Sequence, residues 1–393
     1  MRLAYFVFIA NLSICATAPS TTDEPASPSV PKLKRELAVS LQQRTAGEPV
    51  ALVGGSEMLC AIRKDAPAAC IGEIGLPLAA ADRTLDDGRY SRTHAELPVA
   101  IADLNLRGLD ATDPYIRCTL DPEKGRVRCW WRDLAARRGN LPKELPARDV
   151  VDIAADSQVC TVDKSGTVRC TGGATCFGEH DPEYDQNRPI DVPAVGAARR
   201  VSKGIHMGCV VRTDSTVACW GKTARGQCNP SAVAVPDLRD VVDIATGDYS
   251  ACALRADNRV FCWGDNGRAE LGDPGASFAT TPIEVPLAHP AVKLRSAGRG
   301  FVALRADGSV VGWGHSVFGD RNTPPAKLKF KRPAVDFVAM RGLVCALLDT
   351  GSVECDGYKV RFAEAEGRPR PPFEGKEPWV NAPLYRLAAE PSG

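Results

Sequence analysis

The sequence lacks the features that usually mark catalysis or nucleic-acid binding. Across 393 residues, 49 Lys+Arg balance 48 Asp+Glu, so there is no concentrated positive charge for a nucleic-acid interface. The five histidines show no HExxH pattern or other close ligand spacing. No CxxC pair, no Gly-x-Ser-x-Gly elbow and no phosphate-binding Gly-rich loop with Lys-Ser/Thr is present. We therefore predict no catalytic, cofactor-binding or metal-ligating residue and no nucleic-acid partner.

Long hydrophobic runs are also missing, except at the N-terminus. Arg2 precedes an apolar stretch that ends in small residues, which is typical of a secretory signal peptide over residues 1–18 and too short for a membrane span. Residues 12–15 (LSIC) resemble a bacterial lipobox with Cys15 as the lipidated residue, although Ile14 stands where that motif prefers a small residue. Plain cleavage nearby is the alternative. A Pro/Ser/Thr-rich linker follows over residues 19–32.

Cysteine, in contrast, is abundant, and its placement reveals a repeat. Seven copies align, spaced by 42 to 58 residues, and the best preserved spans residues 241–273. This period fits a four-stranded propeller blade. The aligned positions of the first cysteine are Cys60, Cys118, Cys160, Cys209, Cys252, Val302 and Cys345.

Each copy contains four short β-rich runs separated by Asp, Gly, Asn and Ser turns. Examples are a Pro-bounded run at 189–193 (PIDVP), an apolar run at 150–154 (VVDIA), and two cysteine-bearing runs at 252–255 (CALR) and 259–262 (RVFC). Such runs are typical of strands and hairpins, and no repeated helical period is evident. We predict an all-β, seven-bladed β-propeller with four-stranded antiparallel blades. It forms a single domain over residues 33–393, with the repeats at about 45–360.

The two cysteines of a copy are predicted to face each other across a hairpin. Cys252 and Cys262 are symmetric about Asp257, and directly opposed residues lie within the Cα separation that a disulfide tolerates. In the sixth copy both positions are lost together, to Val302 and Gly312, as expected for a bonded pair. The predicted bridges are Cys60–Cys70, Cys118–Cys129, Cys160–Cys170, Cys209–Cys219, Cys252–Cys262 and Cys345–Cys355.

Several residues stand outside the pattern. Cys176 and Cys228 lie in equivalent loops of adjacent copies, so we predict a bridge between them, with two separate thiols as the alternative. Trp130 belongs to the core by its repeat position, whereas Trp131 replaces a glycine and is either a partner contact or a packing residue. The acidic stretch at 179–185 lacks the spacing and the glycine of a calcium loop, which favours a solvated loop.

A family resemblance lies in these residues. The pattern Cys-Ala-Leu-x-x-Asp-x-x-Val-x-Cys-Trp-Gly, followed by a Leu-Gly loop, resembles the repeat of the regulator of chromosome condensation family, with residues 252–264 as the best copy. The resemblance implies seven-bladed propellers. Nuclear members of the family catalyse guanine-nucleotide exchange, whereas secreted bacterial members resemble binding scaffolds, one class inhibiting β-lactamases. The histidine that often precedes the first cysteine in extracellular copies is replaced here by Gln158, Met207 and Ser250, which indicates a divergent member.

These observations favour a monomeric, exported, non-catalytic scaffold that recognises a protein through loops on one face. We expect it to be secreted or held in a bacterial cell envelope, touching the membrane only through a lipid on Cys15. The alternative is an extracellular hydrolase or lyase that acts on glycans with carboxylates at the central channel; an enzyme inhibitor is less favoured. To close the ring, a terminal segment is expected to pair with the opposite end of the propeller, with residues 37–41 or 377–380 as candidates.

Overall fold

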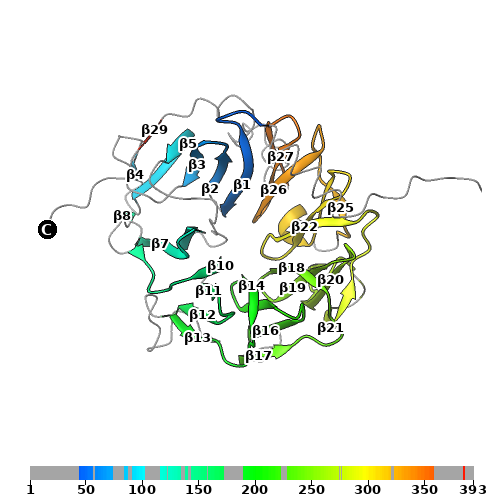
Figure 1. Ribbon diagram of the computed structural model, residues 1–393. Coiled ribbons are helices and arrows are strands. Elements are labelled where there is room, and N and C mark those ends of the chain that lie inside the picture. The colour runs from blue at the N-terminus through cyan, green and yellow to red at the C-terminus, as the bar shows by residue number, and fades with distance from the viewer. Residues whose placement is uncertain are drawn as a thin grey trace, which may run out of the picture.

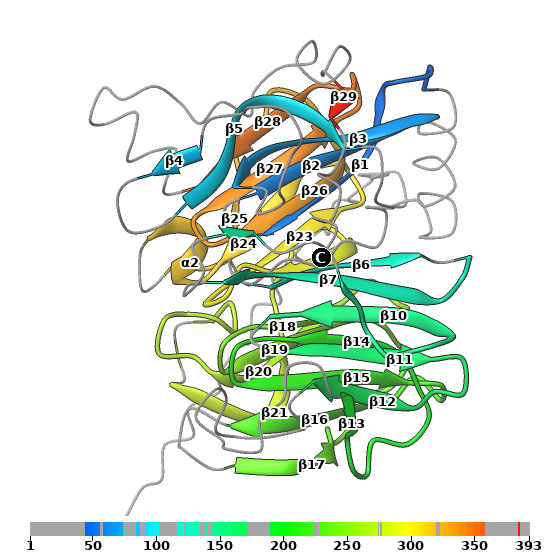
Figure 2. The same cartoon turned by 90° about the vertical axis from the view of Figure 1, so that its left-hand side faces the viewer.

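The computed structural model describes residues 44–55, 58–73, 84–86, 91–101, 116–121, 123–133, 138–139, 143–156, 158–171, 189–222, 228–273, 275, 277–319, 323–357 and 384–385. Their strands form seven sheets, which follow one another around a ring in chain order (Figure 1). The predicted all-β, seven-bladed propeller is therefore confirmed. Figure 2 shows the same blades from the side.

In five of the seven blades the described strands form a meander, in which strands consecutive in sequence pair in antiparallel fashion. The blades contain, in order, β1 (Pro49–Gly55), β2 (Met58–Arg63), β3 (Ala66–Glu73), β4 (Thr84–Asp86) and β5 (Ser91–Ile101); β6 (Ile116–Asp121), β7 (Arg126–Asp133), β8 (Arg138–Gly139) and β9 (Lys143–Glu144); β10 (Val150–Ala155), β11 (Val159–Asp163), β12 (Val168–Thr171) and β13 (Pro189–Asp191); β14 (Ala198–Lys203), β15 (Met207–Arg212), β16 (Val217–Lys222) and β17 (Cys228–Ala234); β18 (Val241–Thr246), β19 (Ser250–Arg255), β20 (Val260–Asp265) and β21 (Phe278–Glu284); β22 (Ala291–Ser296), β23 (Phe301–Arg305), β24 (Val310–Trp313) and β25 (Ala326–Lys327); and β26 (Ala334–Met340), β27 (Leu343–Leu348) and β28 (Val353–Asp356).

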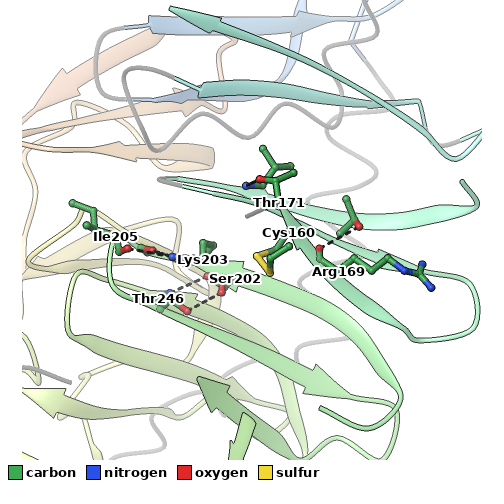
Figure 3. The surroundings of a disulfide bond; sticks show 11 residues. Cys160, Arg169, Thr171, Ser202, Lys203, Ile205 and Thr246 are labelled. Carbon is green, nitrogen blue, oxygen red and sulfur yellow. Dashed lines mark hydrogen bonds between the residues drawn. A yellow bond between two sulfur atoms is a disulfide. The ribbon is translucent and has the colours of Figure 1, made fainter. Parts of the chain in front are cut away.

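Disulfides join the second and third strands of six blades. Each bonded pair lies directly opposite in the ladder, with Cα atoms 4.0–4.1 Å apart. The Cys160–Cys170 bridge packs with Val201 and Trp220 of the next blade, and Figure 3 shows Cys160 facing the strand that carries Ser202 and Lys203. The bridges thus staple the hairpins and also fill the apolar layer between blades. They are Cys60–Cys70, Cys118–Cys129, Cys160–Cys170, Cys209–Cys219, Cys252–Cys262 and Cys345–Cys355.

The sixth blade replaces its bridge by packing. Val302 lies opposite Gly312, as the repeat alignment predicts. A short helix, α2 (His315–Phe318), follows β24 and places Val317 against Gly312, so that a Cβ added at Gly312 would lie 2.6 Å from Val317 Cγ1. Val302 and Val317 are both fully buried. The volume that a disulfide occupies elsewhere is therefore taken by an isopropyl group.

The first and last blades close the ring by direct packing. Blue β1 and orange β26 lie side by side in Figures 1 and 2, and Leu52 and Ile71 share a buried cluster with Val338 and Cys345. The guanidinium of Arg44 donates from one NH2 group to the carbonyls of Leu348 (2.9 Å) and Asp349 (3.0 Å). This contact ties the segment before β1 to the last blade.

The C-terminal segment also reaches the first blade. Strand β29 (Leu384–Tyr385) pairs in parallel with β5, at the outer edge of that sheet. The C-terminal segment therefore adds a strand to the first blade, whereas the sequence predicts a terminal strand that completes the last blade. Both closing strands proposed from the sequence, at 37–41 and 377–380, lie outside the described residues. In the described part of the chain, no helix is both long and apolar enough to cross a membrane.

Candidate functional site

The inner strands surround a central cavity of about 390 Å³. Each described inner strand has a bulge after its first residue, and the residue that follows the bulge occupies an equivalent place in every blade. In the first blade it is Ala51. In the next five described inner strands it is charged, and the sign alternates around the ring: Asp152, Arg200, Asp243, Lys293 and Asp336, here called the charged belt.

Two carboxylates of the charged belt link three blades each. Asp243 accepts hydrogen bonds from NH1 of Arg200 (2.5 Å) and NH1 of Arg295 (3.1 Å), which lie on the blades to either side. Asp336 accepts from the ammonium of Lys293 and from the backbone N–H of Leu52 (2.9 Å). These charge-assisted bonds hold neighbouring inner strands in register.

Asp152 is the least neutralised member of the charged belt. Its Oδ2 accepts from the backbone N–H of Val201 in the next blade (2.9 Å). Desolvation raises the pKa of Asp152 to about 6, while that hydrogen bond and the positive charges of Arg200 and Arg295 act in the opposite direction. The carboxylate of Asp243 adds to the increase. The pKa of Asp152, a carboxyl group of the cavity wall, thus lies close to neutral pH.

The belt was not identified from the sequence, although a signal existed. Three of the apolar runs share an aspartate at the third position, in residues 150–154 (VVDIA), 241–245 (VVDIA) and 334–338 (AVDFV). A charged residue recurring within an otherwise apolar strand indicates a common structural task. The positively charged residues of the belt are Arg200 and Lys293. They lie in repeat copies that have no aspartate at this position.

One face of the ring is formed by the hairpin turns between second and third strands and is called the turn face. In five blades a turn residue with positive φ accepts a hydrogen bond at its carbonyl from the first residue of the next inner strand. Backbone groups of this face are therefore used within the ring. The pairs are Gly125 with Val150 (3.1 Å), Gly166 with Ala198 (2.9 Å), Ser215 with Val241 (3.0 Å), Asn258 with Ala291 (3.0 Å) and Gly308 with Ala334 (2.8 Å).

The opposite face, called the loop face, is formed by the connections between first and second and between third and fourth strands, because successive connections of an antiparallel sheet lie at alternate ends. Half-buried His206 stacks on Tyr249 of the next blade, with ring centroids 4.3 Å apart. Burial lowers the pKa of His206. Nearby, the buried carboxylate of Asp248 binds Arg341 (2.7 Å) and Arg299 (3.2 Å).

The loop after β20 is held in place by the following blade. The indole N–H of Trp313 donates to the carbonyl of Glu270 (2.9 Å), and both side chains are buried. The side-chain oxygen of Asn266 accepts from the backbone N–H of Leu271 (2.8 Å) inside the same loop. This Leu-Gly loop is therefore a fixed part of the loop face.

The other residues singled out in the sequence are only partly described. Trp130 is buried, as predicted from its repeat position. Trp131 lies on β7 opposite Ile116 in the backbone ladder, and its role as a partner contact stays a prediction. Cys228 begins β17, but Cys176 lies outside the described residues, so their bridge also stays a prediction. The same holds for Cys15, the leader and linker over 1–32, and the acidic stretch at 179–185.

Metal-site geometry is not found in the described ranges. Within them, no group of three or more His, Cys, Asp or Glu residues is placed to hold a metal ion. Three histidines are described at the side-chain level, and each has its own neighbour or element: His206 stacks on Tyr249, His289 lies 3.8 Å from Asp307, and His315 begins α2.

Comparison with known proteins agrees with this architecture. Residues 241–269 match the family model described as the regulator of chromosome condensation (RCC1) repeat. No curated protein matches the sequence. Among solved structures, Prp20p of Saccharomyces cerevisiae has a TM-score of 0.59 at 14% identity, covering 80% of this chain and 85% of that one.

Two further structures give the same result. Yeast RCC1 (Prp20) in its complex with Kap60 has a TM-score of 0.57 at 16% identity, covering 71% of this chain and 74% of that one. Human WBSCR16 has a TM-score of 0.55 at 14% identity, with 74% and 84% covered. At these identities the likeness establishes the fold. The chain is a seven-bladed β-propeller, and residues 241–269 of its fifth blade match the regulator of chromosome condensation repeat.

Proposed function

We propose that this chain is an exported, non-catalytic binding scaffold that recognises a protein partner through its loop face. The observation that carries the proposal is the difference between the two faces. On the turn face, five inter-blade hydrogen bonds use the turn carbonyls. The loop face also has inter-blade backbone hydrogen bonds, from Asp248 to Gly298 and from Gly342 to Ser316. In addition, it presents the half-buried rings of His206 and Tyr249 beside the partly exposed Arg299 and Arg341.

The residue types of the loop face are those that contribute most to protein interfaces. Tyrosine and arginine are enriched among residues whose truncation costs the most binding free energy. Arg299 and Arg341 share the single carboxylate of Asp248, so this pairing leaves one positive charge in excess. The shared carboxylate also restricts both side chains before a partner arrives, which lowers the entropy lost on binding.

Proteins of the same fold support a protein partner. Yeast RCC1 (Prp20) has been crystallised bound to Kap60, and Prp20p has binding properties toward Gsp1p and histones. The fold alone does not carry those partners over to this chain. What carries over is the use of a propeller as a protein-binding surface. An enzyme inhibitor is the special case in which the partner is itself an enzyme.

Binding is tested by capture from envelope and secreted fractions with the purified chain. The loop-face variant combines Tyr249→Ala with Arg341→Ala, and the matched control on the turn face is Lys164→Ala, whose ammonium is exposed. We expect the wild type and the control to bind one partner saturably, and the loop-face variant to bind it at least tenfold more weakly. Equal binding by all three chains would move the site away from the loop face, and no saturable partner would contradict the scaffold role.

Export is the second part of the proposal. It is supported by the apolar leader after Arg2 and by six hairpin disulfides, because such bonds persist in oxidising compartments. Cell fractionation with radiolabelled palmitate tests both export and the lipid, with Cys15→Ala as the control. Label on the wild type alone would assign the lipid to Cys15, and a reduced cytosolic product would contradict export.

The glycan-cleaving alternative depends on the charged belt. Asp243 and Asp336 are held by cations from neighbouring blades, which suits a structural role, whereas the raised pKa of Asp152 is the property that a general acid needs. A screen of polysaccharides with the wild type and Asp152→Asn separates the two. Cleavage that disappears in Asp152→Asn and persists in Asp349→Asn, a change in an exposed pair, would favour the enzyme.

A further inference from the structure

Two arginines of the channel share one carboxylate. Arg200 comes from the blade before Asp243 and Arg295 from the blade after it, and each donates through NH1 to a different oxygen of that aspartate. One negative charge therefore lies between two guanidinium groups. Arg295 also donates from NH1 to the carbonyl of Leu294 (2.6 Å), which fixes its orientation.

Both arginines keep unused donors. A guanidinium carries five N–H groups. In the part of the chain that the structure describes, Nε and NH2 of Arg200 and of Arg295 have no hydrogen-bond partner. Both side chains are accessible, at 44% and 43% exposed, and both line the central cavity of about 390 Å³. This volume lies in the range of small-ligand sites.

The described cavity wall carries more positive than negative charge. Its cations are Arg200, Lys203, Lys293 and Arg295, and its carboxylates are Asp152, Asp243 and Asp336, which makes four against three. Lys293 pairs with Asp336. The ammonium of Lys203 donates to backbone carbonyls of residues 204 and 205, as Figure 3 shows. Arg200 and Arg295 share the carboxylate of Asp243, so these three groups by themselves carry one positive charge in excess.

We propose that the central channel binds a small carboxylate-bearing anion, gripped between the unused guanidinium edges of Arg200 and Arg295. A planar carboxylate matches the fork of an arginine, which donates two parallel hydrogen bonds to it. Two such forks on one cavity wall favour a dicarboxylate over a monocarboxylate. The site lies inside the ring and differs from the loop face, so it does not depend on the proposed protein partner.

Isothermal titration calorimetry of the mature chain with its disulfides intact tests the site. The probes are succinate, its neutral analogue succinamide, and inorganic phosphate. We expect saturable binding of succinate with a stoichiometry of one, and none of succinamide. Saturable binding of phosphate in preference to succinate would overturn the carboxylate assignment. Binding of succinate and succinamide alike, or of neither, would overturn the anion site.

Variants locate the binding. Arg200→Lys and Arg295→Lys keep the charge and remove the fork, so each is expected to weaken succinate binding about tenfold. Arg332→Lys is the matched control, because this arginine pairs with Asp349 on the exposed turn face. Thermal unfolding of each variant confirms that the ring is intact. Unchanged succinate affinity in folded Arg295→Lys would overturn the proposed binding by the two arginines. An equally large loss of succinate affinity in Arg332→Lys would overturn it as well.

Discussion

The backbone N–H of Leu52 in the first blade donates to Oδ2 of Asp336 in the last blade, across 2.9 Å and 284 residues of sequence. Both residues are buried. The other oxygen of Asp336 binds Lys293, so one carboxylate connects the sixth, seventh and first blades. The first and last blades of the propeller meet at a seam that no strand connection crosses. At this seam the hydrogen bond from Leu52 to Asp336 joins the two blades.

We predict that Asp336→Ala weakens ring closure. The change leaves the Leu52 N–H without its acceptor and leaves the half-buried ammonium of Lys293 with only the carbonyl of Phe337 (3.1 Å), which should lower the free energy of unfolding by about 2–3 kcal/mol. Asp336→Asn keeps an oxygen for Leu52 and should lie between the variant and the wild type. Urea unfolding followed by tryptophan fluorescence measures both. Asp149→Asn, in an exposed pair with Lys164 away from the seam, is the control, and a loss as large as that of Asp336→Ala would argue against a special role of the seam.

A second prediction concerns the pH dependence of stability through Asp152. Its pKa is raised from near 3.8 to about 6 by desolvation, so the folded chain binds this proton more tightly than the unfolded chain. The stability from this group is fully present below pH 3.8 and is lost as the pH rises through about 6. Asp152→Asn cannot ionise and keeps an acceptor for Val201, so its free energy of unfolding should exceed that of the wild type by about 3 kcal/mol at pH 8.

The measurement for Asp152 is the difference between wild type and variant in urea unfolding from pH 4 to pH 8. The difference removes the contributions of all carboxylates that the wild type and the variant have in common. We expect the gap to widen between pH 4 and 6 and to stay constant above pH 7. A gap that is independent of pH would show that Asp152 is not the group that titrates.

A third prediction tests the contact between a hairpin turn of the turn face and the next blade. Gly308 has φ +76°, and a Cβ added there would lie 2.6 Å from Cβ of Pro333. Pro333 directly precedes β26, the inner strand of the next blade. Gly308→Ala should therefore lower the free energy of unfolding by about 3 kcal/mol, from backbone strain and displacement of the neighbouring blade. Gly47→Ala is the matched control, because its φ is +84° and nothing lies within 4 Å of the added atom.

The control isolates the backbone contribution. Gly47→Ala should cost about 1 kcal/mol, the strain of a left-handed conformation alone. Chemical denaturation of the two variants gives both values. Equal losses would indicate that contact between the turn and the next blade contributes little to stability.

A fourth prediction concerns the blade without a disulfide. In Val302→Cys with Gly312→Cys the two positions are opposed, but the new Cβ at 312 would lie 2.6 Å from Val317 Cγ1. We expect this double variant to be less stable than the wild type and to keep free thiols. Adding Val317→Ala removes the obstructing methyl and should allow the bridge to form, which contributes about 2–3 kcal/mol for a loop of this length.

Thiol titration and non-reducing peptide mapping separate these outcomes. The single variant Val317→Ala is the control. Its free energy of unfolding should be about 1 kcal/mol lower than that of the wild type, because two buried methyl groups are deleted. A bridge in the double variant without the third change would show that Val317 does not occupy the position of the disulfide.

Much of the architecture could be predicted because it is local and repeated. Cys252, Asp257 and Cys262 lie within one hairpin, so their spacing determines the register and the bridge before any tertiary contact forms. Seven copies of such a hairpin at a blade-like period determine the ring. The burial of Trp130 follows from the same alignment.

The charged belt could not be predicted in the same way. Asp152 and Arg200 belong to different repeats, and nothing within either repeat states that their strands lie side by side around a cavity. At the belt position, some copies carry a negative charge and others a positive one. An alignment of the copies therefore shows no consistent residue type there. The assignment of His206 and Tyr249 to one face likewise requires the two blades to be docked.

The sequence by itself therefore determined the blade: strand order, hairpin register, bridges and the residues that turn the chain, because each depends on neighbours a few positions apart. Only the tertiary structure decided what the ring does with those blades. It placed Asp336 against Leu52 to close the seam, and it gathered Arg200 and Arg295 around Asp243. Contacts of that kind depend on the packing angle between blades, and interactions between residues far apart in the chain become visible only when the whole ring has closed.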